Sequence, residues 1–121
     1  MPIVTIELVR QPQEKFGGEL VSGLASGLGK VFGSSAGGTW VKVYQLTSES
    51  YAENGGSAAD TFPVIVHVLK SSLPTSDHMQ KEVEEITSVV ARLTNRRQDL
   101  VHIIYEPPGK GRVAFGGSIV K

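Results

Sequence analysis

The sequence contains no cysteine, which excludes a disulfide framework and a metal site built on thiolates. Neither positive nor negative charge is in excess. The 12 Lys and Arg residues balance the 12 Asp and Glu residues, so neither nucleic acid nor an anionic membrane is expected as a partner. The three histidines, His67, His78 and His102, are scattered and form no ligand motif, so we expect no metal site.

Long hydrophobic runs are missing too. The first residues are typical of a strand and include no basic region followed by an apolar stretch, so the sequence predicts neither a signal peptide nor a membrane span. A cytoplasmic location is the default expectation. With 121 residues, the chain is long enough for one domain with a core and short enough to gain stability from oligomerisation.

What the sequence does contain is an internal repeat. The segment PIVTIEL at residues 2–8 returns as PVIVHVL at residues 63–69, an offset of 61 residues that also pairs Trp40 with Val101. In the middle of each half an offset of 62 matches better, and it pairs Leu24 with Ile86. Ordered matches of this kind predict a single domain that consists of two repeats. We expect these repeats at residues 1–61 and 62–121.

Each repeat is predicted to run strand, helix, strand. Segments rich in β-branched residues predict four short strands, at residues 3–9, 40–46, 64–69 and 100–105. Apolar residues at helical spacing predict a first helix from about Glu14 to Phe32 and a second that is capped by Thr75 or Ser76.

Strands that alternate with helices indicate parallel β-α-β units. We therefore expect an α/β (α+β) fold with a four-stranded sheet and both helices on one face. Residues 64–66 and 103–104 are apolar on both sides of their strands, although two helices cover only one side. The other face is expected to meet another protein surface, in an oligomer whose sheets pack against each other.

These residues resemble the tautomerase superfamily, whose members have a β-α-β unit and a catalytic proline exposed by removal of the initiator methionine. Residues 63–121 look most like a complete 4-oxalocrotonate tautomerase subunit, including the hairpin GRVAFGG at residues 111–117. The first half is similar in outline, with a divergent hairpin around Tyr51–Gly56. The resemblance implies a tautomerase/MIF-like fold, a homotrimer, and a cofactor-independent reaction on a small carboxylate or carbonyl substrate.

The resemblance also implies that Pro2 is the catalytic residue once Met1 has been removed. A free α-amino group has a reference pKa of about 7.7–8.0, and burial or nearby cations lower that pKa. Near neutral pH such an amine acts as a general base, moving a proton between an enol and a carbon of the substrate. Pro63 cannot do so, because its nitrogen is a tertiary amide, and its expected role is to start a strand.

Other candidate residues are carried over from the family by position. Arg10 and Lys70 lie near the place of an arginine that follows the first strand, although Arg10 comes two residues early. The family often has a second arginine early in the second strand, and in this sequence that place holds Lys42 in the first repeat and His102 in the second. Lysine offers a carboxylate a point charge, whereas arginine offers a planar guanidinium that can form two hydrogen bonds. Each of these side chains also has an ordinary structural or solvated interpretation.

The end of the chain supplies three further candidates. Phe115 represents the family's hairpin aromatic, and Arg112 is a nearby contact for an anion. Glu106 is a candidate for an acid or for a hydrogen bond to water. A hydratase, dehalogenase or decarboxylase of the same superfamily would use Pro2 with such an acid. If Met1 stays attached, Pro2 has no basic nitrogen, and a non-catalytic trimeric binding protein is the alternative.

Overall fold

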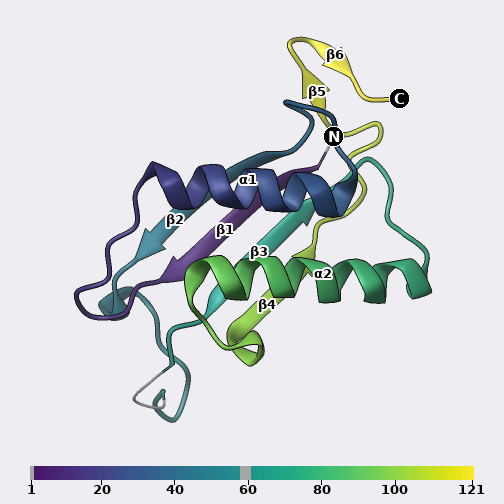
Figure 1. Cartoon of the computed structure of the whole chain (residues 1–121). Coiled ribbons are helices and arrows are strands. Elements are labelled where there is room, and N and C mark those ends of the chain that lie inside the picture. The colour runs from purple at the N-terminus through teal and green to yellow at the C-terminus, as the bar shows by residue number, and fades with distance from the viewer. Residues whose placement is uncertain (1, 58–60) are drawn as a thin grey trace.

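The computed structural model describes residues 2–57 and 61–121, which form a four-stranded sheet covered by two helices (Figure 1). The strands are β1 (Ile3–Val9), β2 (Trp40–Leu46), β3 (Val64–Leu69) and β4 (Val101–Tyr105), and the helices are α1 (Gly18–Phe32) and α2 (Ser76–Thr94). In the order β2-β1-β3-β4, β1 is parallel to β2 and β3 to β4, while β1 and β3 are antiparallel. The predicted fold, with both helices on one face, is confirmed.

The element boundaries differ from the prediction in two places. β4 starts at Val101 rather than at residue 100, because Gln98–Leu100 forms a short 3₁₀ turn, η2. α1 starts at Gly18 rather than at Glu14, so that boundary was wrong. The Glu14 carboxylate accepts a hydrogen bond from the Gln11 backbone N–H at 2.9 Å and binds a buried arginine, which holds this segment out of the helix.

The pairing of the strands shows that the offset of 61 is wrong by one residue. The side chains buried against the helices are even-numbered in both inner strands: Val4, Ile6, Leu8, Val64, Val66 and Val68. An odd offset would place equivalent residues on opposite faces of the sheet, so the offset must be even. The buried pair Leu24 and Ile86 shows an offset of 62 in the helices, and an even offset in the strands means that Pro2 does not correspond to Pro63.

The core lies between the helices and one face of the sheet. Leu24 and Leu28 of α1 and Ile86 and Val90 of α2 are fully buried there against the even-numbered residues of β1 and β3. Burial of this apolar surface is the main favourable contribution to folding.

The opposite face of the sheet is uncovered within the subunit. Trp40 and Tyr44 of β2 are 53% and 55% exposed there, and Ile104 of β4 is 48% exposed. Large apolar side chains gathered on one face mark a surface for interaction. Among the described residues, no helix combines the length and the apolar character needed to cross a membrane.

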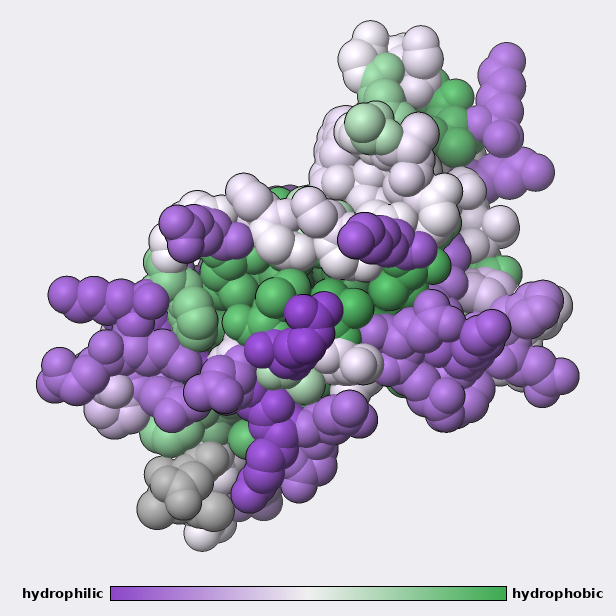
Figure 2. Space-filling view, in the orientation of Figure 1, coloured by the Kyte–Doolittle hydropathy of each residue, from purple (hydrophilic) through white to green (hydrophobic). Residues whose placement is uncertain are grey.

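The two helices approach each other closely at Gly27 of α1. A Cβ atom added to Gly27 would lie 2.8 Å from Cγ1 of Val89 on α2, closer than van der Waals contact allows. Figure 2 shows apolar side chains between the two helices. Val89 and Leu93 of α2 lie there, next to Gly27 and Gly23 of α1. The glycine therefore lets α2 pack against the backbone of α1.

A buried arginine joins the two halves of the chain. Arg96, just after α2, is 7% exposed, and its guanidinium donates two bonds of 2.7 Å to the two carboxylate oxygens of Glu14. It also donates to the carbonyl oxygens of Phe62, Thr94 and Val9, at 2.9, 2.7 and 2.8 Å. All five N–H groups of the guanidinium are thus satisfied.

The close approach of the helices generates a first prediction. Gly27→Ala should destabilise the protein by about 1–2 kcal/mol, because overpacking against Val89 outweighs the better helix propensity of alanine. Gly29→Ala, in the same helix, is the matched control: its Cβ meets nothing within 4 Å, so it should stabilise by up to about 1 kcal/mol. Urea unfolding at one protein concentration measures both, and equal stabilisation by the two variants would contradict the helix packing described.

The ion pair of Arg96 generates a second prediction. Burial raises the pKa of Glu14, but the hydrogen bonds from Arg96 and Gln11 outweigh it, so the pKa lies below its usual value of 4.5. Glu14→Gln should cost roughly 2–4 kcal/mol at neutral pH, because it leaves the buried guanidinium without its counter-ion.

The same pKa shift sets the pH dependence of that loss. A carboxylate with a lowered pKa stabilises the folded state above its unfolded pKa, and this contribution disappears as the pH falls through the folded pKa. The gap in unfolding free energy between wild type and Glu14→Gln should therefore be constant above about pH 4.5 and shrink below it. Asp99→Asn, which breaks the exposed pair with Arg97, is the control and should show no such loss.

Candidate functional site

Pro2 lies immediately before β1, one of the two inner strands, and is buried. Its carbonyl oxygen accepts a hydrogen bond of 3.0 Å from the backbone N–H of Trp40, the first residue of β2. Beside it is a hollow of about 200 Å³, which we call the Pro2 hollow. The hollow is lined by Pro2, Ile3, Gly37, Gly38, Trp40 and Phe115.

Two aromatic rings form one wall of the Pro2 hollow. The centroids of Trp40 and Phe115 lie 5.2 Å apart with an interplanar angle of 83°, an edge-to-face pair. The indole N–H of Trp40 donates to the carbonyl oxygen of Gly37 at 3.0 Å, which fixes the ring against the connector between α1 and β2.

The second ring comes from a hairpin near the carboxyl terminus, formed by β5 (Ala114–Phe115) and β6 (Ser118–Ile119). Gly116 and Gly117 make its turn with φ angles of 57° and 95°, which glycine adopts without strain. Figure 1 shows this hairpin at the end of the sheet where β1 begins. The structure thus brings together two of the predicted site residues, Pro2 and Phe115.

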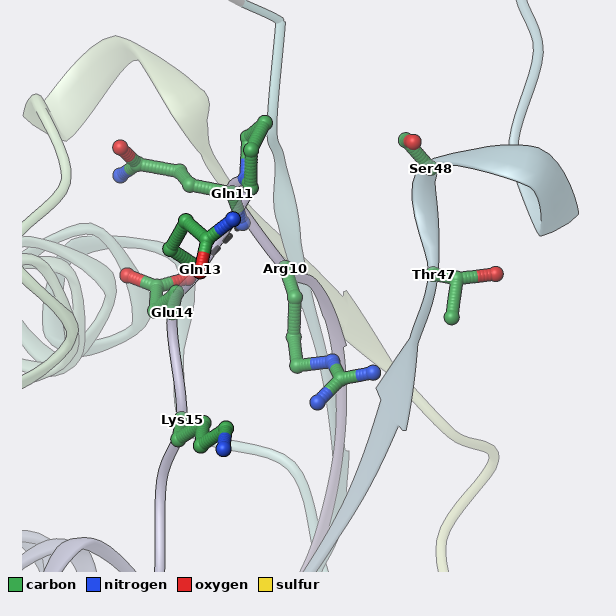
Figure 3. Close-up of a pocket in the computed structure, with 8 residues that line it drawn as sticks. Arg10, Gln11, Gln13, Glu14, Lys15, Thr47 and Ser48 are labelled. Carbon is green, nitrogen blue, oxygen red and sulfur yellow. Dashed lines mark hydrogen bonds between the residues drawn. The ribbon is translucent and has the colours of Figure 1, made fainter.

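Arg10 lies at the other end of β1. It lines a hollow of about 340 Å³, the Arg10 hollow, together with Gln11, Pro12, Gln13, Glu14, Lys15, Thr47 and Ser48. Figure 3 shows the Arg10 guanidinium and the Lys15 ammonium extending on the same side of this segment, with the Glu14 carboxylate on the other. The Nε atom of Arg10 is buried and has no hydrogen-bond partner among the described residues.

The Arg10 hollow has the chemistry of an anion site, but it is far from Pro2 in the same subunit. At about 3.3 Å per residue, β1 separates the two residues by roughly 25 Å. Arg10 and Pro2 of one chain therefore cannot contact the same small molecule.

Lys42 and Glu106 both line a third hollow, on the uncovered face of the sheet. This sheet-face hollow has a volume of about 470 Å³ and is lined by Ile3, Thr5, Glu7, Lys42, Tyr44, His67, Leu69 and Glu106. It shares Ile3 with the Pro2 hollow, so the two are neighbours.

A histidine between two carboxylates occupies the sheet-face hollow. The Nε2 atom of His67 lies 2.8 Å from Oε1 of Glu7, and its Nδ1 atom lies 3.2 Å from Oε1 of Glu106. A neutral imidazole carries only one N–H, so satisfying both contacts requires a second proton in the cluster. In the described part of the chain, no group of three or more His, Asp or Glu side chains is placed to hold a metal ion.

Lys70 is engaged within the subunit. Its ammonium lies 2.9 Å from Oε2 of Glu82 on α2 and 5.2 Å from the centroid of the Phe32 ring. The Tyr105 hydroxyl donates to the other oxygen of Glu82 at 2.8 Å. Burial and this bond to the carboxylate raise the pKa of Tyr105 well above its usual value of 10.0.

Two further candidate residues, His102 and Arg112, do not line the Pro2 hollow. His102 is exposed on β4, on the same face of the sheet as Trp40 and Lys42. Arg112 donates from Nε to the carbonyl oxygen of Pro108 and from Nη2 to that of Pro107, both at 2.9 Å, and so braces the base of the hairpin.

Sequence reasoning did not assign Trp40, His67 or Arg96 to any cluster. The offset of 61 matched Trp40 with the buried Val101, whereas the offset of 62 seen in the helices matches it with the exposed His102. For His67 the signal was its place on the outer face of β3, diagonal to Glu7 across the antiparallel pair with β1.

Comparison with known proteins gives no match for the sequence but several for the fold. No protein-family model matches the sequence, and no curated protein matches it. Solved structures do match: a fused 4-OT described as a wild-type asymmetric trimer has a TM-score of 0.77 at 11% identity, over 97% of this chain and 94% of that chain. The chain has the fold of the tautomerase superfamily.

Two other members of the superfamily match over a similar length. The macrophage migration inhibitory factor from Oncomelania hupensis has a TM-score of 0.76 at 13% identity, over 100% of this chain and 83% of that chain. A malonate semialdehyde decarboxylase inhibited by 3-bromopropiolate has a TM-score of 0.69 at 17% identity, over 94% and 88%. A superfamily that includes tautomerases, decarboxylases and this factor defines the fold of the chain but not its reaction.

Proposed function

We propose that this protein is a cofactor-independent tautomerase, an isomerase that uses Pro2 as its general base after Met1 has been removed. The observation that carries the proposal is the position of Pro2: it starts an inner strand of a tautomerase-superfamily fold and faces a hollow large enough for a small molecule.

The chemistry of a free Pro2 amine suits this reaction. Burial in the apolar Pro2 hollow disfavours the charged form of an amine and lowers its pKa toward neutrality. The neutral secondary amine then takes a proton from an enol hydroxyl or an α-carbon of the substrate. The ammonium returns the proton elsewhere on the conjugated system.

The substrate's carboxylate needs a cation that the Pro2 hollow does not supply from its own described lining. We propose that Arg10 of a second subunit supplies it, because the two residues are too far apart within one chain. A planar guanidinium can bind a carboxylate through two hydrogen bonds, and its Nε atom is without a partner within the subunit.

A homotrimer would bring the two hollows together. Two solved structures of fused 4-OT that resemble this chain are described as trimers, with TM-scores of 0.77 and 0.76. The uncovered face of the sheet, with Trp40, Tyr44 and Ile104, is the surface we propose to be buried between subunits of a cytoplasmic trimer. Lys42, Lys70, His102, Glu106 and Arg112 then remain candidates for contacts with the substrate at this assembled site.

One observation favours a second candidate, a non-catalytic trimeric binding protein on the same fold. The ammonium of Lys70 and two donors of Arg112 are already engaged within the subunit, which leaves few charges free for a reaction. A hydratase or decarboxylase would need Glu106 as an acid, yet its Oε1 atom lies 3.2 Å from His67.

Removal of the base tests the proposal. Intact mass should show that Met1 is absent from the natural protein. The processed protein should catalyse enolisation of phenylpyruvate or ketonisation of 2-hydroxymuconate, and Pro2→Ala should lower kcat/KM by about 10²-fold or more, as expected for a general base. Methionine retained on nearly every chain, or equal rates from the two proteins, would rule out catalysis by Pro2 and favour the binding protein.

Mixing of subunits tests the role of Arg10. Pro2→Ala and Arg10→Gln variants should each be poorly active alone. Trimers formed after unfolding and refolding a 1:1 mixture should regain activity, because about a quarter of the sites then combine an intact Pro2 with an intact Arg10 of a neighbour. One variant is labelled with ¹⁵N so that native mass can verify that the subunits have mixed. If mixed trimers regain no activity, Arg10 does not serve a neighbouring Pro2.

A further inference from the structure

The Arg10 hollow contains an acidic side chain as well as basic ones. Glu14 follows Arg10 by four residues and lines the hollow together with Arg10 and Lys15. Even so, no ion pair joins Arg10 or Lys15 to a described residue. A carboxylate tethered this closely can compete with a ligand at an effective concentration on the order of millimolar. What holds Glu14 therefore decides whether Arg10 can bind an anion.

Arg96 holds both oxygens of Glu14 from outside the hollow. Its Nη1 and Nη2 atoms lie 2.7 Å from Oε2 and Oε1 of Glu14, and the Gln11 N–H donates to Oε1 at 2.9 Å. The Arg96 side chain is 1% exposed and that of Glu14 is 15% exposed, so solvent and salt screen the pair little. Because Arg96 does not line the Arg10 hollow, it acts on that hollow through Glu14.

The charges of Glu14 and Arg10 already interact. Burial raises the pKa of Glu14, the hydrogen bonds from Arg96 and Gln11 together outweigh it, and the positive charge of Arg10 lowers the pKa further. The Nε atom of Arg10 is buried and has no partner among the described residues. This donor can be satisfied by the Glu14 carboxylate or by that of a ligand, but not by both in the same way.

The turn that carries Glu14 has an uncommon backbone conformation. Gln13 has a φ angle of 67°, in the left-handed region that residues other than glycine rarely adopt. The Glu14 N–H donates to the Gln11 carbonyl oxygen at 3.1 Å, and the Glu14 carboxylate accepts from the Gln11 N–H. Such a conformation persists where surrounding contacts enforce it, and the pair of Glu14 with Arg96 is a contact of this kind.

We propose that Arg96 is a positioning residue for the anion site at Arg10. By holding both oxygens of Glu14, Arg96 keeps this carboxylate away from Arg10, whose guanidinium then binds the carboxylate of a ligand. The inference rests on the role proposed above for Arg10, but it does not depend on catalysis by Pro2.

Binding of a simple carboxylate to Arg10 tests the inference without turnover. The probe is propionate, its control is uncharged propionamide at the same ionic strength, and the readout is the ¹⁵Nε–H resonance of Arg10 in assembled protein without Met1. Loss of one resonance in Arg10→Gln assigns it. Propionate should shift this resonance in wild type, whereas propionamide should not.

Arg96→Lys should weaken the binding of propionate about fivefold or more. It replaces the planar fork by a point charge that cannot hold two oxygens in one geometry, so Glu14 would occupy Arg10 for most of the time. Arg97→Lys is the matched control: this neighbouring arginine is 71% exposed, pairs with Asp99 and does not line the Arg10 hollow. It should leave the affinity unchanged.

A second substitution separates positioning from a purely structural role. The double variant Arg96→Lys/Glu14→Gln lacks the competing carboxylate, so its affinity for propionate should return to within about twofold of wild type. If the ion pair only maintained the structure of the segment, the double variant would bind as weakly as Arg96→Lys or more weakly. Native mass and urea unfolding check that each variant is assembled and folded.

The outcomes separate this inference from the proposed function. Unchanged affinity in Arg96→Lys, a double variant without recovery, or a wild-type Arg10 resonance that does not respond to propionate overturns the inference. An affinity that follows Arg96 and Glu14 as expected, in a protein whose Pro2→Ala variant reacts as fast as wild type, supports the positioning role and refutes only catalysis by Pro2.

If Arg96→Lys fails to fold, two variants of Glu14 decide. Glu14→Asp keeps the carboxylate but is too short to hold both Nη atoms of Arg96, whereas Glu14→Gln removes the competing charge. Weaker binding of propionate to Glu14→Asp than to Glu14→Gln supports the inference, and equal binding overturns it.

Discussion

The buried guanidinium of Arg96 is the constraint on which the arrangement of both halves depends. A charge removed from water must find partners for all of its donors, and Arg96 finds them on four different segments of the chain. Its bonds tie the end of α2 to the end of β1, to Phe62, two residues before β3, and to Glu14. The last of these bonds keeps Glu14 out of α1 and gives residues 10–15 the conformation that forms the Arg10 hollow.

Antiparallel pairing of β1 with β3 then decides where functional groups lie. Because the second β-α-β unit runs opposite to the first, Pro2 and the end of β3 share one end of the sheet, while Arg10 and the start of β3 share the other. A base and a cation separated by a whole strand cannot act on one small substrate within a subunit. In the proposed trimer, another subunit would complete the site through the uncovered sheet face, which carries the exposed aromatic residues.

Charge near the amino terminus is mostly paired inside the subunit. Lys70 binds Glu82, Arg112 braces the hairpin through two carbonyl groups, and Glu106 lies against His67. What remains beside Pro2 is an apolar hollow with a tryptophan wall. Such surroundings favour an uncharged amine and an uncharged part of the ligand, and they leave recognition of a carboxylate to groups outside the hollow.

The sequence alone determined most of the secondary structure and the β-α-β organisation, because these follow from local periodicity. Pro2 became the catalytic candidate through the resemblance of the sequence to the tautomerase superfamily. Three of the four main strands have the predicted bounds. It did not determine the register of the repeat, since a slip of one residue preserves the apolar character of a segment such as residues 64–66 while it exchanges the two faces of the strand. Only the tertiary structure showed that Trp40 lies beside Pro2, that His67 lies between Glu7 and Glu106, and that Arg10 lies far from Pro2. These are contacts and separations between strands, and they depend on strand order and direction, which no local pattern encodes.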